Sequence, residues 1–253
     1  AFSEWGCAAP FSVANADSNV FWLAKNTLGQ GLVVMTTGYQ ANIISTDAIS
    51  DQIASLTTIN DAFGYCYQYQ RHIFYVLTFP TERRTFVYDI STQMWHEWSS
   101  YETEGRHDSN THDLFEGNHL VGDAVDGKIY RLDWNRFNEN GFPITRLRRS
   151  PHIYHENKYV FHRGLEVEFE GGVGSWAGVN DPQIMLRWSD DGGNTWSNEH
   201  FRSLGKEGEY KNFAEWRRLG RSKDRVYEIK MTDDVNAVIV NGWVDILATD
   251  RNE

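Results

Sequence analysis

The chain has 253 residues, an aromatic fraction of 14%, 21 glycines against 5 prolines and a formal net charge of −11. Aromatic side chains fit half-buried strands and glycines fit tight turns, so this composition favours a β-rich protein of one large domain or two ordinary ones. The acidic balance argues against broad, direct binding of nucleic acid, which needs lysine and arginine in place of the phosphate counterions. No apolar segment approaches the roughly 20 residues of a membrane helix.

Cys7 and Cys66 are the only cysteines, which is too few for a disulfide framework or a four-cysteine zinc site but leaves one disulfide open. Residues 1–9 lack the basic start and the long apolar core of a signal peptide. The chain has no initial methionine and opens in what looks like the middle of a domain, so we expect a fragment or a processed product.

Short apolar segments predict strands in three successive units of the first half. Residues 19–46 contain three such segments, separated by turns at near-regular spacing. Residues 61–100 repeat the plan with four strands. The shorter unit at residues 119–134 is predicted to be a hairpin around Asp126 and Gly127, a pair that favours a two-residue turn.

These units are typical of β-propeller blades, because small antiparallel units recur at roughly 40 residues. About three units do not close a propeller, which typically has four blades or more. We therefore expect propeller-like blades in residues 1–140, and the missing blades lie upstream of Ala1 or in the second half.

Residues 46–60 are the only good helix candidate. Apolar residues recur there at helical spacing: Ile49, Ile53 and Leu56. The expected cap is Ser45 or Asp47.

From residue 141 onward the strands are longer, with residues 143–156 and 159–170 each predicted to form one. Apolar and acidic residues alternate strictly in the second of them, so one face carries Leu165, Val167 and Phe169, and the other Glu166, Glu168 and Glu170. Residues 141–253 are predicted to form a C-terminal antiparallel β-domain. A β-sandwich and a terminal pair of blades both fit the pattern.

A hairpin with a decorated turn is the most specific pattern in the chain. The segment IMLRWSDDGGNTW, residues 184–196, predicts a strand, a turn and a second strand that starts at Thr195 and Trp196. Its turn fits S-x-D-x-G-x-T-W, the Asp-box, with the key places taken by Ser189, Asp191, Gly193, Thr195 and Trp196. In this turn the side-chain oxygens of serine and aspartate can accept hydrogen bonds from the turn's own backbone amides. The glycine can adopt a positive φ, and the tryptophan can pack over the turn and cover it. We interpret the Asp-box as a structural turn, as in the sialidases and other families that carry it.

The acidic strand face could also carry chemistry. Alternate residues on a strand lie about 7 Å apart, a separation found between the paired carboxylates of glycosidases. A solvated strand face explains the same pattern without any ligand, and we favour that interpretation for Glu166, Glu168 and Glu170.

Two histidine-containing segments are candidates for metal binding. The first, residues 104–117, holds a mixed set of potential ligands: His107, Asp108, His112 and Asp113. Their spacing matches no ligand motif, and we interpret the segment as a polar loop. In the second segment, His152 and His155 would face opposite sides of a strand, so a shared ligand role is not expected.

Arginines concentrate in two segments. One contains Arg146, Arg148 and Arg149, and the other contains Arg217, Arg218, Arg221, Lys223 and Arg225. On strands these side chains could pair with the acidic face or form a docking patch. We name six as a possible interface: Arg146, Arg148, Arg149, Arg217, Arg218 and Arg221.

Common catalytic and nucleotide-binding motifs are absent, including G-x-S-x-G, G-x-x-x-x-G-K-[ST] and paired C-x-x-C. Nothing in the chain assembles a nucleophile, a base and an orienting group. We therefore assign no catalytic, cofactor-binding or metal-binding residue and expect no cofactor.

Several segments resemble the packaged-DNA stabilisation proteins, or tail hub proteins, of short-tailed (podovirus) bacteriophages. They are VFWLAKNTLGQGLVV at residues 20–34, the segment 74–98, VGDAVDGKIYRLD at residues 121–133, and the region from residue 184 to residue 229. The resemblance implies a non-enzymatic structural subunit, present in about six copies below the portal and adaptor rings. It also implies contacts with the portal and adaptor, the tail needle and the tailspikes, and retention of packaged DNA by completing the tail. The expected location is the virion tail, after assembly in the host bacterial cytoplasm and without a membrane.

Two other functions stay open, a glycan-active enzyme of the sialidase type and a carbohydrate-binding module with exposed tryptophans. A sialidase-like site needs clustered arginines with a Tyr–Glu pair, which the two arginine segments do not supply. A pocket where such side chains converge would favour the enzyme, and large apolar patches would favour assembly.

Overall fold

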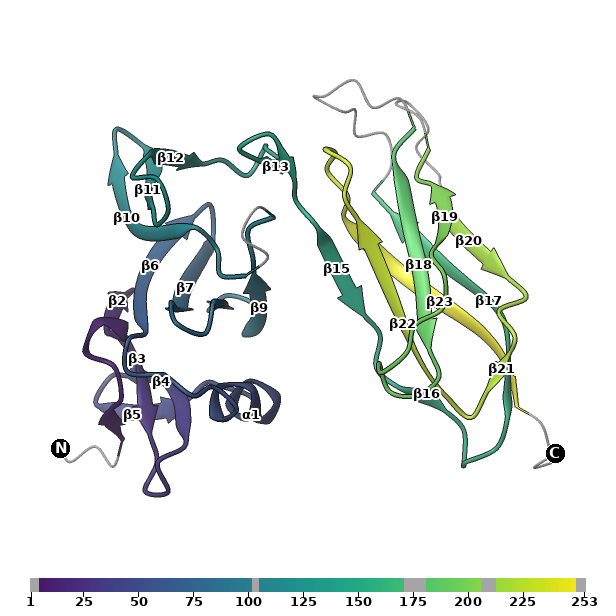
Figure 1. The fold of residues 1–253 in the computed structure, drawn as a ribbon, viewed down its shortest axis with the longest axis horizontal. Helices are drawn as coiled ribbons and strands as arrows, with labels where there is room; N and C mark the ends of the chain where they lie inside the picture. The colour runs from purple at the N-terminus through teal and green to yellow at the C-terminus, as the bar shows by residue number, and fades with distance from the viewer. Residues whose placement is uncertain (1–4, 102–104, 171–180, 206–212, 249–253) are drawn as a thin grey trace. The chain divides into compact units, whose positions relative to one another are not determined.

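The computed structural model describes residues 5–101, 105–170, 181–205 and 213–248. The chain forms two compact units, Ala1–Asp133 and Trp134–Glu253, which are built almost entirely of antiparallel strands (Figure 1). The all-β fold predicted from composition and strand patterns is confirmed. Among the described residues, no helix has the length and apolar composition needed to cross a membrane.

The first sheet of the N-terminal unit contains β1 (Gly6–Cys7), β2 (Ala14–Ala16), β3 (Asn19–Lys25), β4 (Gly31–Thr37) and β5 (Gln40–Ile43), with the 3-10 helix η1 (Pro10–Ser12) before β2. Strands β3, β4 and β5 follow one another through hairpins, as predicted. Their buried residues Phe21, Leu23 and Val33 belong to the largest core cluster of the unit. Cys7 and Cys66 are both free thiols.

The second sheet has four strands in sequence order: β6 (Phe63–Tyr69), β7 (His72–Phe79), β8 (Arg84–Asp89) and β9 (Met94–Trp98). Its central strands are buried on both faces, since Tyr75 and Leu77 join the core shared with β3, whereas Phe74 and Val76 join a second core. A sheet packed on both faces is what neighbouring propeller blades require.

The third sheet contains β10 (Ser109–Phe115), β11 (Asn118–Asp123) and β12 (Ile129–Leu132). The hairpin between β11 and β12 was predicted, but the interpretation of residues 104–117 as a polar loop was wrong. β10 is a polar edge strand that pairs with β11 through its backbone, and most of its side chains are exposed. An edge strand of this kind has no apolar face and therefore no hydrophobic period to detect.

The helix α1 (Asp47–Ala54) is shorter than predicted, and its cap is neither Ser45 nor Asp47. The hydroxyl of Thr46 accepts a hydrogen bond from the amide of Ile49 at 3.4 Å. The helix ends early because Thr57 and Thr58 donate their amides to one Glu82 carboxylate oxygen, at 2.9 and 2.7 Å. These long-range bonds replace the helical ones that continuation to residue 60 would need.

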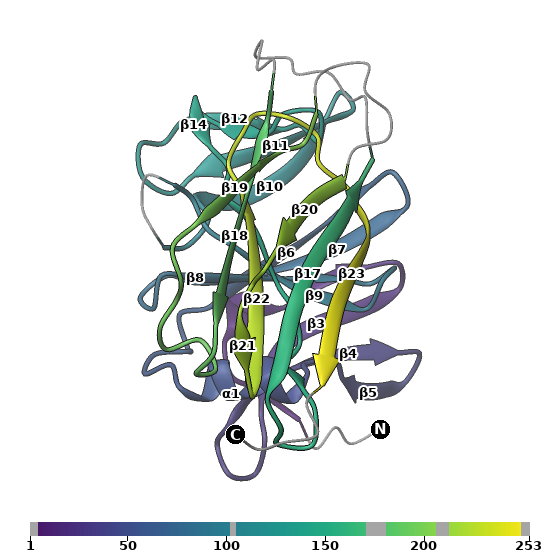
Figure 2. The ribbon, with the colours of Figure 1, turned by 90° about the vertical axis from the view of Figure 1, so that its right-hand side faces the viewer.

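The C-terminal unit begins with a hairpin of β13 (Asn138–Glu139) and β14 (Phe142–Pro143), and two larger sheets follow. The first contains β15 (Arg146–Arg149), β16 (Ile153–Tyr154), β18 (Gln183–Ser189), β19 (His200–Ser203) and β22 (Asp224–Met231). The second contains β17 (Val160–Phe169), β20 (Phe213–Arg217), β21 (Arg221–Ser222) and β23 (Ile239–Ala248). Figure 2 shows β23 running along β17, with which it pairs over nearly its whole length.

One core joins the two larger sheets, which makes this unit a β-sandwich. Leu165 and Val167 of β17 pack in the same cluster as Ile184 and Leu186 of β18 and Trp216 of β20. The alternation predicted for β17 is confirmed, because its apolar residues are buried and its glutamates reach the outer face. The structure thereby decides between the two architectures that the sequence left open.

The prediction of one long strand over residues 143–156 was wrong, since the segment holds the last residue of β14 and two short strands, β15 and β16. After β15 the amide of Ser150 still donates to the carbonyl of Tyr227 at 2.8 Å. Pro151 follows and has no amide hydrogen for the next ladder position, so the chain leaves the sheet and returns as β16.

Candidate functional site

The Asp191 carboxylate organises the turn after β18. Its Oδ1 accepts hydrogen bonds from the Ser189 hydroxyl at 2.7 Å and from the amides of Asn194 and Thr195 at 3.0 and 2.8 Å. Its Oδ2 accepts from the Thr195 hydroxyl at 2.6 Å. These bonds, led by that from Ser189, hold the pKa of Asp191 well below its usual range. Gly193 adopts a φ of 98°, the positive value expected there.

The second strand of this hairpin does not start at Thr195 and Trp196, as predicted, but at His200. Between Trp196 and His200, the Ser197 hydroxyl accepts a hydrogen bond from the amide of Trp188 at 3.0 Å, and the Ser197 amide donates one to the Trp188 carbonyl at 2.9 Å. The Ser197 hydroxyl thus replaces one backbone carbonyl as hydrogen-bond acceptor, and regular strand pairing with β18 starts only at His200.

Trp196 covers the turn from the side and is only half-buried. Its indole N–H donates to the Gly193 carbonyl at 3.0 Å. The guanidinium carbons of Arg149 and Arg187 lie 5.1 and 4.7 Å from its ring centre, within the range of cation–π contacts. Both arginines also bind Glu228, whose side chain is 0% exposed: Arg149 at 2.7 Å on one oxygen and Arg187 on the other. This buried carboxylate was missed, because half of the residues of β22 are charged and nothing in the sequence distinguishes the buried glutamate or its partners.

Arg225 does not belong to the surface arginines with which the sequence grouped it. Its side chain is 2% exposed and forms a two-pronged ion pair with Asp190, at 2.6 and 2.8 Å. A third N–H donates to the carbonyl of Leu219 at 2.5 Å. Arg225 therefore ties the Asp-box turn to the loop after β20.

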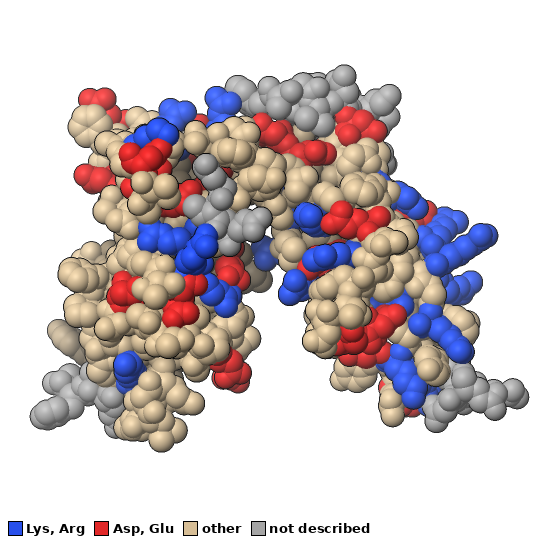
Figure 3. Space-filling model, viewed as in Figure 1, with Lys and Arg blue, Asp and Glu red and all other residues tan. Residues whose placement is uncertain are grey.

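The six proposed interface arginines lie on two different sheets, Arg146 to Arg149 on β15 and Arg217 to Arg221 on and after β20. Arg146 is held inside its unit by the carbonyls of Asp233 and Val235. Arg148 is exposed. Figure 3 shows lysine and arginine side chains gathered along the right-hand edge of the C-terminal unit, where Figure 1 labels β17, β20 and β21.

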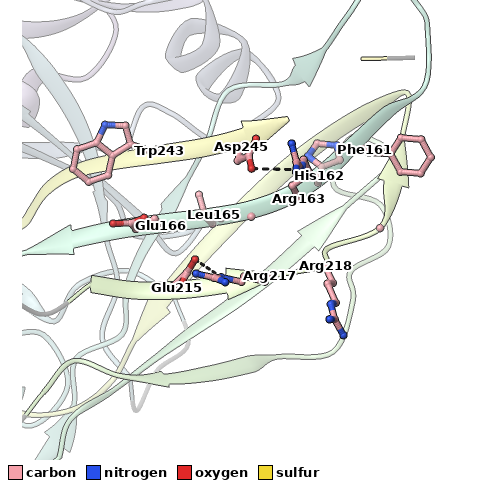
Figure 4. Close-up of a pocket in the computed structure, with 12 residues that line it drawn as sticks. Phe161, His162, Arg163, Leu165, Glu166, Glu215, Arg217, Arg218, Trp243 and Asp245 are labelled. Atoms are coloured by element: carbon pink, nitrogen blue, oxygen red, sulfur yellow. Dashed lines mark hydrogen bonds and ion pairs between the residues drawn. The ribbon is translucent and has the colours of Figure 1, made fainter. Parts of the chain in front are cut away.

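An open cleft of about 730 Å³ lies on the outer face of the second sandwich sheet (Figure 4). It is lined by two rows of residues that lie side by side on β20, β17 and β23, in that order. The rows are Glu215–Glu166–Trp243 and Arg217–Gly164–Asp245. Arg217 pairs with Glu215 on its own strand and not with the predicted acidic face of β17. Arg163 lies 3.7 Å from Asp245.

The candidate metal ligands around residue 107 do not converge on one point. His107 bonds the Ser109 hydroxyl at 2.7 Å, whereas His112 bonds His119 at 2.9 Å. Asp113 accepts the amide of Leu114. Within the described residues, no group of three or more histidine, cysteine or acidic side chains could hold a metal ion.

The HxxH residues are also separate. His152 bonds Asp224 at 2.7 Å, and His155 forms an isolated bridge with Lys158. They flank β16 rather than lying within one strand, so the predicted arrangement on opposite strand faces does not apply.

Blade-like antiparallel meanders followed by a β-sandwich define an all-β protein of two domains. Residues 1–136 match the family model "Bacteriophage P22 Gp10, beta-propeller", and residues 145–246 match "Bacteriophage P22 Gp10, beta-sandwich". The chain therefore belongs to the bacteriophage P22 Gp10 family, the packaged-DNA stabilisation or tail hub proteins of podoviruses.

Other comparisons are weaker. A glycoside hydrolase family 43 arabinoxylan arabinofuranohydrolase from Bacillus subtilis, in complex with cellotetraose, is 11% identical with a TM-score of 0.24, and the match covers 96% of this chain and 55% of that one. A second structure, titled glycoside hydrolase, is 10% identical with a TM-score of 0.23, and the match covers 92% and 59%. The chain thus spans less than two thirds of either, and these scores support no shared activity. No curated protein matches the chain.

Proposed function

We propose that this protein is a tail hub subunit that joins the portal–adaptor assembly to the tail needle and the tailspikes and so keeps packaged DNA inside the particle. The match of both units to the P22 Gp10 family models carries this proposal. The proposed role is structural, without catalysis or a cofactor, in a ring of about six copies. The proposed location is the tail of the virion, reached by assembly in the host cytoplasm.

Exposed apolar side chains on the N-terminal unit support assembly. Tyr39 is 98% exposed at the turn between β4 and β5, and Leu28 is 81% exposed at the turn between β3 and β4. Phe11, Val125 and Ile129 are exposed to a similar extent. Burial of these apolar side chains by another surface would be favourable, which fits a subunit with several neighbours.

The exposed arginines suit contacts with acidic neighbours. Arg148, Arg218 and Arg221 are all exposed in a chain whose net charge is −11. Complementary potential of this kind sets the orientation of subunits and depends on salt. The overall acidity argues that DNA is retained by closure of the channel rather than by direct wrapping.

The test is complementation of a phage that lacks the gene for this protein. Without it, we expect particles that fill with DNA and then lose it, and that carry no needle or tailspikes in electron micrographs. The protein supplied in trans restores complete particles. Particles that retain DNA and bear a full tail in its absence would rule the proposal out.

A further inference from the structure

The cleft on the outer face of the sandwich has charges of both signs in balance. Arg163 lies 3.7 Å from Asp245, and Arg217 is hydrogen-bonded to Glu215. Arg218 and Glu166 add one further charge of each sign to the lining. A polyanion such as nucleic acid would meet carboxylates here, so the cleft favours a ligand that is polar and neutral.

Aromatic side chains lie at both ends of the cleft. Trp243 on β23 is 45% exposed and lies opposite Glu166, and Phe161 at the start of β17 is 41% exposed. Figure 4 shows them on either side of the charged residues. At about 3.3 Å per residue, the strand from Phe161 to Glu166 spans roughly 16 Å, the length of about three sugar rings.

The floor between the two ends is open. Gly164 lies there between Arg217 and Asp245 and contributes no side chain. The cleft volume of about 730 Å³ falls within the usual range of small-ligand sites, roughly 300–1,000 Å³. A ligand can therefore lie along β17 with its edges beside the ion pairs.

We infer that this cleft binds a neutral oligosaccharide of about three units. The apolar C–H face of a sugar packs on each aromatic ring, and the hydroxyl groups between them exchange hydrogen bonds with the carboxylates and guanidinium groups. The pairs Arg163–Asp245 and Arg217–Glu215 are exposed, so their remaining N–H groups and oxygens are accessible to sugar hydroxyls. A protein partner fits less well, because it would desolvate the central charges without replacing their hydrogen bonds. This property goes beyond the structural role and does not depend on it.

The experiment titrates the chain with four trisaccharides in saturation-transfer NMR: maltotriose, cellotriose and N,N′,N″-triacetylchitotriose, which are neutral, and trigalacturonic acid, which is acidic. We expect saturable binding of at least one neutral sugar with a Kd of about 1 mM or tighter. Trp243→Ala weakens this binding about tenfold or more, and Phe161→Ala has the same direction of effect. Phe201→Ala is the matched control, since Phe201 is an aromatic residue of similar exposure on β19, outside the cleft.

Two results would overturn the inference. They are no saturable binding of any of the three neutral sugars, whether or not trigalacturonic acid binds, and binding that Trp243→Ala leaves unchanged. Melting curves of each variant show that the protein is folded, so lost binding is not confused with lost structure. Loss of the tail hub function in complementation leaves this outcome untouched, because the titration uses the isolated chain.

Discussion

At the residue scale, the acidic and basic side chains of the C-terminal unit bind one another in small closed sets. Asp191 accepts bonds only from its own turn, Glu228 lies between Arg149 and Arg187, and Arg225 is paired with Asp190, among the contacts of the described residues. Such charge-assisted hydrogen bonds stabilise the turn and the sheet.

Asp191→Ala should lower the melting temperature without loss of any binding function, because the amides of Asn194 and Thr195 lose their acceptor. Trp196→Ala should cost roughly 1–3 kcal/mol, less than a fully buried tryptophan. The measurement is thermal unfolding against Asn198→Ala, an exposed neighbour. Full stability of Asp191→Ala together with loss of a ligand would contradict the structural interpretation of the Asp-box.

Glu228→Gln should lower the free energy of unfolding by about 2 kcal/mol, because the hydrogen bonds from Arg149 and Arg187 lose the charge on their acceptor while both arginines keep access to water. Urea denaturation measures this change. Glu199→Gln is the control, since Glu199 pairs with Lys230 at 3.2 Å at a partly exposed site. Equal changes in the free energy of unfolding for the two substitutions would show that the buried Glu228 contributes no more to stability than a partly exposed ion pair.

Because the buried His162 has a lowered pKa, we expect the free energy of unfolding to fall in acid. Burial, helped by the charge of Arg225, lowers its pKa from 6.5 to about 4, and its ring lies against Ser222 and Tyr227. Between pH 6.5 and pH 4, His162 is protonated in the unfolded chain and neutral in the folded chain. The free energy of unfolding therefore falls as the pH is lowered from 6.5 to 4, and the contribution of this group then levels off. The full contribution is roughly 3 kcal/mol. His162→Gln should flatten the measured pH dependence, and His155→Gln, at an exposed site, should not.

At the element scale, β17 carries two faces with different tasks. Its inner residues Leu165 and Val167 hold the sandwich together, and its outer glutamates line or adjoin the cleft. The carboxylate Glu166 lies directly opposite Glu215 on β20 and beside Arg217. The P22 Gp10 family models indicate a structural phage protein.

We therefore expect no glycoside hydrolysis. Sialosides and bacterial surface polysaccharides incubated with the chain should show no release of sugar beyond the rate of a heated sample. Reproducible turnover that disappears with Glu166→Gln or Glu168→Gln would contradict this prediction and place a catalytic pair on β17.

At the scale of the whole molecule, both units expose apolar side chains, such as Tyr39 and Leu28 in the N-terminal unit and Tyr154 and Val240 in the C-terminal unit. The C-terminal unit also exposes the arginines of β15, β20 and β21. Single contacts between exposed charges contribute little, about 1 kcal/mol or less, so the proposed assembly would need several of them acting together.

Reversal of Arg148 and Arg221 to glutamate should reduce the incorporation of the protein into tails severalfold without unfolding it, because both are exposed and lie outside the cleft. The measurement is the yield of DNA-retaining particles, compared with the melting temperature of the purified variant. Arg71→Glu, at an exposed turn of the N-terminal unit, is the control. Unchanged yield with a folded double variant would remove these arginines from the interface.

Local patterns in the sequence determined much of the fold. The hairpins of residues 19–46 and 61–100, the alternation of β17 and the chemistry of the Asp-box turn all depend on residues close together in the chain, so short-range preferences suffice to specify them. Only the tertiary structure decided what distant segments do to one another. Glu82 accepts amide hydrogen bonds just after the end of α1, and Asp190 pairs with the buried Arg225. The polar segment β10 is a strand because its backbone pairs with β11. The cleft likewise forms only when β17, β20 and β23, far apart in sequence, lie side by side. Backbone pairing and ion pairing between remote residues leave no period in the sequence, and this is why the site had to come from the structure.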